Sequence, residues 1–198
     1  MSITTNEKYN LFGDLGVGKV PYNASSPVIA QTISLELANT TGGSLGSGQI
    51  NLTAIYLPLA TTITNITLLS NSTAESGGSH LWFALYDDGR SSSSAGQLAL
   101  LSQTADQTGA TVFAANSALT LALLAPYVTT YSGIYYIAFC CTASTVPSLA
   151  NGQASSLVAI TASGVTIATS VTSTFTNLAP NPSGALTATM IPFYSYVS

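Results

Sequence analysis

The single histidine of this chain, His80, is the side chain best suited to acid–base catalysis. A Ser–His–Asp triad would have to use it, with Asp87, Asp88 or Asp106 orienting the imidazole ring. Zinc would need three or four clustered histidine, cysteine or acidic ligands, and the sequence does not group such residues. We therefore expect His80 to be a polar residue that opens a strand. We expect no catalytic residue and no metal site.

The acidic pair Asp87 and Asp88 directly precedes Gly89 and Arg90. Asp-Gly is a strong turn signal, because aspartate bonds to nearby backbone N–H groups and glycine accepts a positive φ. One functional alternative is a calcium site that adds Asp106 and carbonyl oxygens. Another is a carboxylate pair for glycoside hydrolysis, drawn from Glu75, Asp87, Asp88 and Asp106. A turn is the simpler interpretation, since the sequence singles out no pair and no regular series of oxygen ligands.

Charged residues make up 5% of the chain, whereas they make up about a quarter of an ordinary soluble domain. None follows Asp106, and the basic residues are Lys8, Lys19 and Arg90 alone. With a net charge of −4, the chain lacks the clustered basic patch that phosphate binding requires. Its longest apolar runs are about half of the roughly 20 residues that a membrane helix needs. We expect no enzymatic activity and no cofactor, and neither nucleic acid nor membrane among the partners.

Two adjacent cysteines, Cys140 and Cys141, lie inside an apolar run. Neighbouring residues of a strand point to opposite faces, so these two thiols are poorly placed to form a disulfide with one another. We expect two buried free thiols.

The aromatic residues suggest a carbohydrate-binding alternative, because sugar-binding sandwiches present exposed aromatic rings beside neutral polar groups. The candidate glycan contacts are Tyr127, Tyr131 and Trp82. Tyr127 and Tyr131 flank a Thr-Thr turn and are the better candidates for exposure. For Trp82, core packing is the favoured interpretation, since it lies in the apolar run at 81–86.

From residue 49 onward, short apolar runs alternate with Gly, Pro, Asn and Ser at a spacing of about 8–12 residues, which is typical of all-β sandwiches and barrels. Leu119, Leu121 and Leu123 have a period of two, which favours a strand over the helix that Ala and Leu would otherwise favour. The strands that we expect cover 49–59, 62–70, 80–87, 97–103, 118–124, 133–142, 155–162, 165–170 and 186–196. The sequence predicts an antiparallel two-sheet β-sandwich of jelly-roll type over 49–198.

Residues 1–48 differ from the rest, because they hold both lysines and long Gly-, Ser- and Thr-rich stretches with little periodicity. We expect an extended N-terminal arm there, with a short strand over 28–37. Its apolar and basic side chains are candidates for contacts with other subunits: Tyr9, Leu11, Phe12, Lys19 and Tyr22.

Several segments resemble a β-sandwich module of structural proteins from tailed bacteriophages, particularly those that infect actinobacteria. The first three are Trp82-Phe83-Ala84-Leu85-Tyr86-Asp87, Thr104-Ala105-Asp106-Gln107-Thr108 and the stretch 126–136, which reads Pro-Tyr-Val-Thr-Thr-Tyr-Ser-Gly-Ile-Tyr-Tyr. The stretches 57–66 and 145–149 are similar to that module as well. The resemblance covers roughly 49–150 and extends only weakly beyond it.

The resemblance implies a non-enzymatic virion protein that is assembled in the host cytoplasm. It would be a capsid decoration or minor capsid protein, or a tail-associated protein, and its partners would be other virion proteins. We expect a homo-oligomer, with a trimer as the first candidate, in which the arm provides the attachment. The alternative is a carbohydrate-binding module for host-surface glycans.

Overall fold

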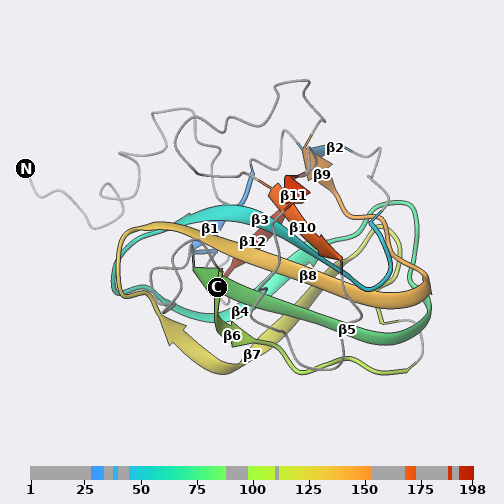
Figure 1. Cartoon of the computed structure of the whole chain (residues 1–198), viewed down its shortest axis with the longest axis horizontal. Coiled ribbons are helices and arrows are strands. Elements are labelled where there is room, and N and C mark those ends of the chain that lie inside the picture. Colours follow the sequence, from blue (N-terminus) through green and yellow to red (C-terminus); the bar gives the residue numbers. More distant parts are fainter. Residues whose placement is uncertain are drawn as a thin grey trace, which may run out of the picture.

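The computed structural model describes residues 28–33, 38–39, 45–87, 98–109, 112–152, 168–172, 187–188 and 192–198. Their regular structure is entirely β, in twelve strands that pair antiparallel (Figure 1). Within these ranges, no helix is long and apolar enough to cross a membrane.

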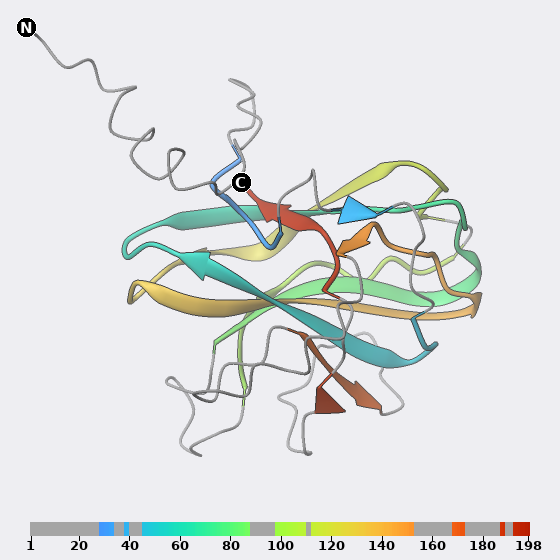
Figure 2. The ribbon, with the colours of Figure 1, turned by 90° about the horizontal axis from the view of Figure 1, so that it is seen from above.

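The strands form two main sheets, which Figure 2 shows as two layers. The four-stranded sheet has the order β1 (Ala30–Gln31), β12 (Ser195–Val197), β4 (Thr62–Leu69), β7 (Ala118–Val128). The six-stranded sheet has the order β11 (Thr187–Ala188), β10 (Ala168–Thr172), β3 (Gln49–Leu57), β8 (Gly133–Thr145), β5 (Ser76–Asp87), β6 (Ala99–Gln103). A small third sheet pairs β2 (Ala38–Asn39) with β9 (Asn151–Gly152). The predicted all-β, antiparallel two-sheet sandwich is therefore confirmed, while its jelly-roll connectivity stays a prediction.

Side-chain alternation along the strands builds the main core between the two sheets. On β5, Leu81, Phe83 and Leu85 point into this core, and on β8 Ile137 and Phe139 do the same. Burial of such side chains stabilises the fold by about 1.5–3 kcal/mol each. The period-two pattern of the sequence thus identifies the residues that hold the sheets together.

The opposite face of the six-stranded sheet carries a second buried cluster, the outer cluster. Its members come from β3, β5 and β8 and from the residue before β6: Ile50, Leu52, Trp82, Ala84, Tyr86, Leu98, Tyr136, Ala138 and Cys140. The central strands β5 and β8 are consequently apolar on both faces, so they read as continuous hydrophobic runs in the sequence.

The two sheets approach one another along one side, where β6 and β7 meet. Thr104 forms an isolated antiparallel bridge with Leu123. The Ser102 hydroxyl donates a hydrogen bond of 2.7 Å to the carbonyl of Ala125. These contacts cover part of the outer edge of β7, which would otherwise present unpaired backbone groups.

The segment 118–124 is a strand, as its period predicted. It forms the first part of β7, which begins at Ala118. The single strand expected over 186–196 is wrong: β11 belongs to the six-stranded sheet and β12 to the four-stranded sheet. Pro192, which lacks a backbone N–H, lies between them and is outside both strands. The strand expected over 155–162 lies outside the described residues.

Two pieces of the predicted arm pair with later strands. Ala30 and Gln31 form β1, which pairs with β12, and β2 pairs with β9. Of the short strand expected over 28–37, the structure shows the two residues of β1, at the edge of the four-stranded sheet, while 34–37 lie outside the described residues. Residues 1–27 lie outside the described part of the chain, so the arm over them stays a prediction.

Candidate functional site

The structure brings together two residues of the hypothetical triad, His80 and Asp106. Nδ1 of His80 lies 2.7 Å from Oδ2 of Asp106, and the backbone N–H of Leu81 donates to Oδ1 of Asp106 at 2.9 Å. A bulge in the pairing of β5 with β8, between Gly78 and His80, sets the local direction of the strand. The His80 side chain is 31% exposed, whereas the Asp106 side chain is 8% exposed.

A nucleophile for this pair would have to lie nearby. Cys140 is a candidate, because it is close enough for the Asp106 carboxylate to affect its pKa. Burial, together with the smaller effects of Cys141 and Asp106, raises the pKa of the Cys140 thiol to about 12. A thiol becomes reactive when its pKa is lowered and the thiolate is exposed. The pKa of Cys140 is raised instead, and its side chain is buried. The pair of His80 and Asp106 therefore connects the segment after β6 to β5. Cys140 does not provide this pair with a competent thiol nucleophile.

The other carboxylates do not join this pair. Asp87 is fully buried at the far end of β5, seven residues from His80, or roughly 23 Å along an extended strand. The calcium set of Asp87 with Asp106 is therefore not assembled, and Asp88 lies outside the described residues. Among the residues that the structure describes, no group of three or more His, Cys, Asp or Glu side chains could hold a metal ion.

Glu75 is 1% exposed and lies on the main-core side of the six-stranded sheet, where its charge raises the pKa of Cys141. Burial raises the pKa of Glu75, while hydrogen bonds from the backbone N–H groups of Phe113 and Val112 lower it. The Glu75 N–H in turn donates to the Phe113 carbonyl at 3.0 Å. Glu75 thus fixes the segment before β7, whereas Asp106 binds His80 and Leu81, so the two carboxylates have separate partners.

The two cysteines are buried and free, as predicted. Cys140 belongs to the outer cluster and Cys141 to the main core, so the neighbours do point to opposite faces. Burial raises the pKa of Cys141 to about 12 as well.

The three candidate glycan contacts differ in their exposure. Trp82 is fully buried in the outer cluster, so core packing is confirmed and a glycan contact through Trp82 does not fit the structure. Tyr131 is half-buried and stacks on Tyr135, with ring centroids 4.6 Å apart and planes 14° from parallel. Tyr127 is half-buried too, and it meets Tyr135 edge to face at 6.4 Å.

One side of the Tyr131 ring, at Cδ2 and Cε2, is close to the backbone at Gly133. A Cβ added there would lie 2.8 Å from Cε2 of Tyr131. The hydroxyl of Tyr131 donates to the carbonyl of Ile134, and that of Tyr135 donates to the carbonyl of Tyr131. The stacked pair is thus built into the turn between β7 and β8, which leaves little free ring surface for a sugar.

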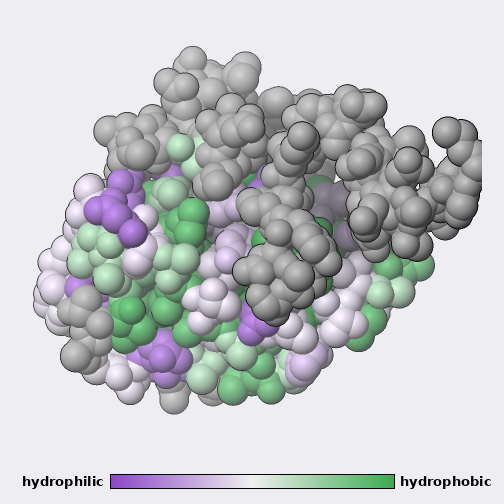
Figure 3. Space-filling model, turned by 180° about the vertical axis from the view of Figure 1, so that it is seen from behind, coloured by the Kyte–Doolittle hydropathy of each residue, from purple (hydrophilic) through white to green (hydrophobic). Residues whose placement is uncertain are grey.

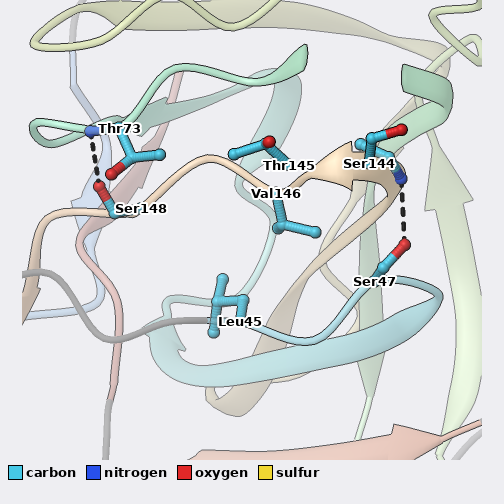
Figure 4. A pocket seen from close by; sticks show the side chains of 8 residues that line it. Leu45, Ser47, Thr73, Ser144, Thr145, Val146 and Ser148 are labelled. Atoms are coloured by element: carbon cyan, nitrogen blue, oxygen red, sulfur yellow. Dashed lines mark hydrogen bonds between the residues drawn. The ribbon is translucent and has the colours of Figure 1, made fainter. Parts of the chain in front are cut away.

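A separate pocket of about 400 Å³ lies beside the end of β8, and the sequence reasoning missed it (Figure 4). Its lining is Leu45, Ser47, Thr73, Ala143, Ser144, Thr145, Val146 and Ser148. Serine and threonine are so frequent in this chain that no pattern sets these hydroxyls apart before the strands are placed.

One further serine stands in a pattern that sequence analysis overlooked. Gly42-Gly43-Ser44-Leu45-Gly46 matches the Gly-x-Ser-x-Gly spacing of nucleophilic serines. That motif requires a strand before the serine and a helix after it, and here the next element is strand β3. Ser44 itself lies outside the described residues, as do the five candidate contacts of the arm, Tyr9, Leu11, Phe12, Lys19 and Tyr22.

Comparison with known proteins gives no relative from which a role could be transferred: the chain matches no protein-family model, and no curated protein matches it in sequence.

Proposed function

We propose that this chain is a non-enzymatic structural protein of a phage virion, either a capsid decoration or minor capsid protein or a tail-associated protein, which acts as a homo-oligomer. The sequence resemblance over 49–150 supports the phage context. The observation that carries a structural role is a rigid, uncharged and apolar surface at one end of the sandwich, which suits contact between subunits.

This surface, the apolar end, consists of Leu59 in the turn before β4, and of Leu124 and Val128 on β7. Each of the three residues is more than half exposed. Tyr56 on β3 is exposed as well, but its neighbours Ile55 and Leu57 face the main core, so it points to the outside of the other sheet. Val128 pairs with Thr62 at the start of β4, next to the turn that carries Leu59. Large apolar side chains that gather on a surface mark interaction sites more often than scattered ones do.

Hydrogen bonds between two turns hold the apolar end in place. Thr129 donates its hydroxyl to the Pro58 carbonyl and accepts the Thr61 N–H, and its backbone is bonded to Ala60 and Thr61. The Leu59 N–H donates to the Ser132 hydroxyl at 2.8 Å. A surface that is already ordered loses little conformational entropy when it docks.

The charge distribution favours a second copy as the occupant. Within the described ranges the acidic and histidine side chains are Glu75, His80, Asp87 and Asp106, and of these only Asp87 lies near this end, where it is fully buried. A symmetric contact brings the same patch of the two copies together, so an uncharged patch avoids like-charge repulsion. Figure 3 shows the same tendency on the back of the molecule, where strongly hydrophilic residues form only isolated spots.

Native mass spectrometry of the full chain tests the oligomer. We expect a defined homo-oligomer that the double variant Leu59→Asp/Val128→Asp converts to folded monomer. Ser72→Asp, at the opposite end of β4, is the matched control and should leave the oligomer intact. A wild-type chain that stays monomeric at every concentration would contradict the proposal.

Mass spectrometry of purified phage particles tests the virion assignment. We expect the chain in the particles in a fixed ratio to the major capsid or tail protein. Its absence from particles that are produced in cells expressing it would remove the phage context. A truncation lacking residues 1–27 addresses the arm, since we expect it to fold but to be lost from particles.

A further inference from the structure

We propose that the pocket beside the end of β8, here called the hydroxyl pocket, binds a neutral polyhydroxylated ligand, namely a sugar residue. This assignment is independent of the virion proposal, and it uses residues other than the aromatic candidates of the sequence. It rests on the arrangement of hydroxyl and apolar groups that line the pocket.

The hydroxyl groups of the pocket keep free hydrogen-bonding capacity. Ser47 Oγ accepts the Ala143 N–H at 3.1 Å, and Ser148 Oγ accepts the Thr73 N–H at 3.0 Å. A hydroxyl that accepts one such bond still has its own proton to donate and a second lone pair. These oxygens are therefore fixed in position and can still bond to the hydroxyls of a ligand.

One wall of the pocket is particularly well ordered. The Asn71 N–H donates to the Ser148 carbonyl at 2.7 Å, and the Ser148 N–H donates to the Thr73 carbonyl at 3.2 Å. Together with the side-chain bond to Ser148, three hydrogen bonds hold this wall. Preorganised polar groups bind with a smaller entropic loss than mobile ones.

Apolar side chains lie between the two polar ends of the pocket. Figure 4 shows Val146 and Leu45 pointing toward one another, with Thr73 and Ser148 at one end and Ser47 and Ser144 at the other. Both apolar side chains also pack against the main core. A sugar ring has the matching character, because its C–H face is apolar and its rim carries hydroxyls.

The absence of charge from the lining selects against ions. None of the eight lining residues is ionisable. An anion or cation that entered would lose hydration without gaining an opposite charge, which is costly. The volume of about 400 Å³ lies at the lower end of the range of about 300–1,000 Å³ for small-molecule sites, so one or two sugar rings fit.

The test is NMR titration of the full chain with neutral monosaccharides: glucose, galactose, mannose and N-acetylglucosamine. We expect at least one to shift the amide signals of Ser47, Thr73 and Ser148 saturably. A glycan array in parallel distinguishes free sugar from the terminal residue of a glycan. Binding on the array alone assigns the ligand to glycans, and binding in the titration alone assigns it to free sugar.

The double variant Ser144→Ala/Thr145→Val removes two exposed hydroxyls and leaves the backbone contacts in place. We expect it to weaken sugar binding about tenfold or more, since each lost hydrogen bond is worth roughly a factor of ten. Its melting temperature should stay unchanged, and Ser72→Ala, outside the pocket, should bind as the wild type does. The proposal is overturned if no sugar binds in either assay, if the double variant binds equally well, or if inorganic phosphate binds as tightly.

Discussion

Oε1 of Glu75 occupies the position where a side chain of Gly78 would begin: a Cβ built on Gly78 lies 1.7 Å from it. Glycine at this position thus makes room for a buried carboxyl group, which in turn binds the backbone N–H of Phe113 at 3.3 Å. The start of β5 and the segment before β7 are therefore connected through one acidic side chain.

Gly78→Ala should displace the Glu75 carboxyl group and loosen the segment that it fixes. We expect a loss of about 1–3 kcal/mol in the free energy of unfolding, which is typical of overpacking. Urea denaturation measures it. Gly46→Ala is the comparison, because an added Cβ there meets the uncharged and only half-buried side chain of Gln49, and it should cost less stability than Gly78→Ala. Equal losses in the two variants would contradict this account.

The stability that Glu75 contributes should depend on pH. Burial raises its pKa in the folded state above the ordinary value of 4.5. The folded state then holds the proton more tightly than the unfolded state does, so the contribution is fully present below pH 4.5 and is lost as the pH rises through the raised pKa.

Urea denaturation of the wild type and of Glu75→Gln across this pH range measures that effect. We expect the stability of the wild type relative to the variant to fall as the pH rises, because glutamine does not titrate. A difference that is constant or that rises with pH would show that Glu75 does not titrate as its burial implies.

Asp106 should stabilise the fold through the two groups that it binds, His80 Nδ1 and the Leu81 N–H. Asp106→Ala leaves the Leu81 N–H and His80 Nδ1 without this partner, and we expect a loss of about 1–3 kcal/mol in unfolding free energy. Asp106→Asn keeps an acceptor for Leu81 and should lose less. Thermal and urea denaturation compare the two. If both variants are as stable as the wild type, the pair has no structural role.

The two thiols should be unreactive in the folded protein. Burial raises the pKa of both Cys140 and Cys141 to about 12, so almost no thiolate is present at mildly alkaline pH. We expect Ellman's reagent to label neither cysteine until denaturant is added, and then to label both. Fast labelling of the native protein would show that this part of the sheet opens readily.

Thr129→Val tests the connection between the turns of the apolar end. The substitution keeps the shape of the side chain but removes the hydroxyl that bonds to Pro58 and Thr61. We expect a loss of about 1–3 kcal/mol, because a part-buried carbonyl and N–H lose their partner. Thr62→Val, at an exposed strand position, is the control and should be nearly neutral. A neutral Thr129→Val would mean that the backbone bonds suffice.

The local elements of this fold could be predicted from the sequence because they depend on neighbours along the chain. The period of Leu119, Leu121 and Leu123 identified β7, and adjacency alone placed Cys140 and Cys141 on opposite faces. The strand expected over 186–196 failed, because the pattern does not say to which sheet each half of a segment pairs.

The candidate sites could not be derived in the same way, since they depend on contacts between distant segments. His80 and Asp106 are 26 residues apart and meet only because β6 lies beside β5. The hydroxyl pocket joins Ser47, Thr73 and Ser148, which no periodicity relates. The close approach of Tyr131 to Gly133 involves residues only two apart, yet the Thr-Thr turn beside Tyr131 had favoured an exposed ring.

The position of β12 has a consequence for the order of folding. It follows every other described strand along the chain, yet it lies between β1 and β4 in its sheet. Of the described strands, β1 is synthesised first. On the ribosome it cannot complete its pairing with β12 until residue 197 has emerged. Pairing across such a separation is slow. Until β12 pairs, this edge of β4 stays unpaired, and unpaired strand edges favour aggregation of the folding chain.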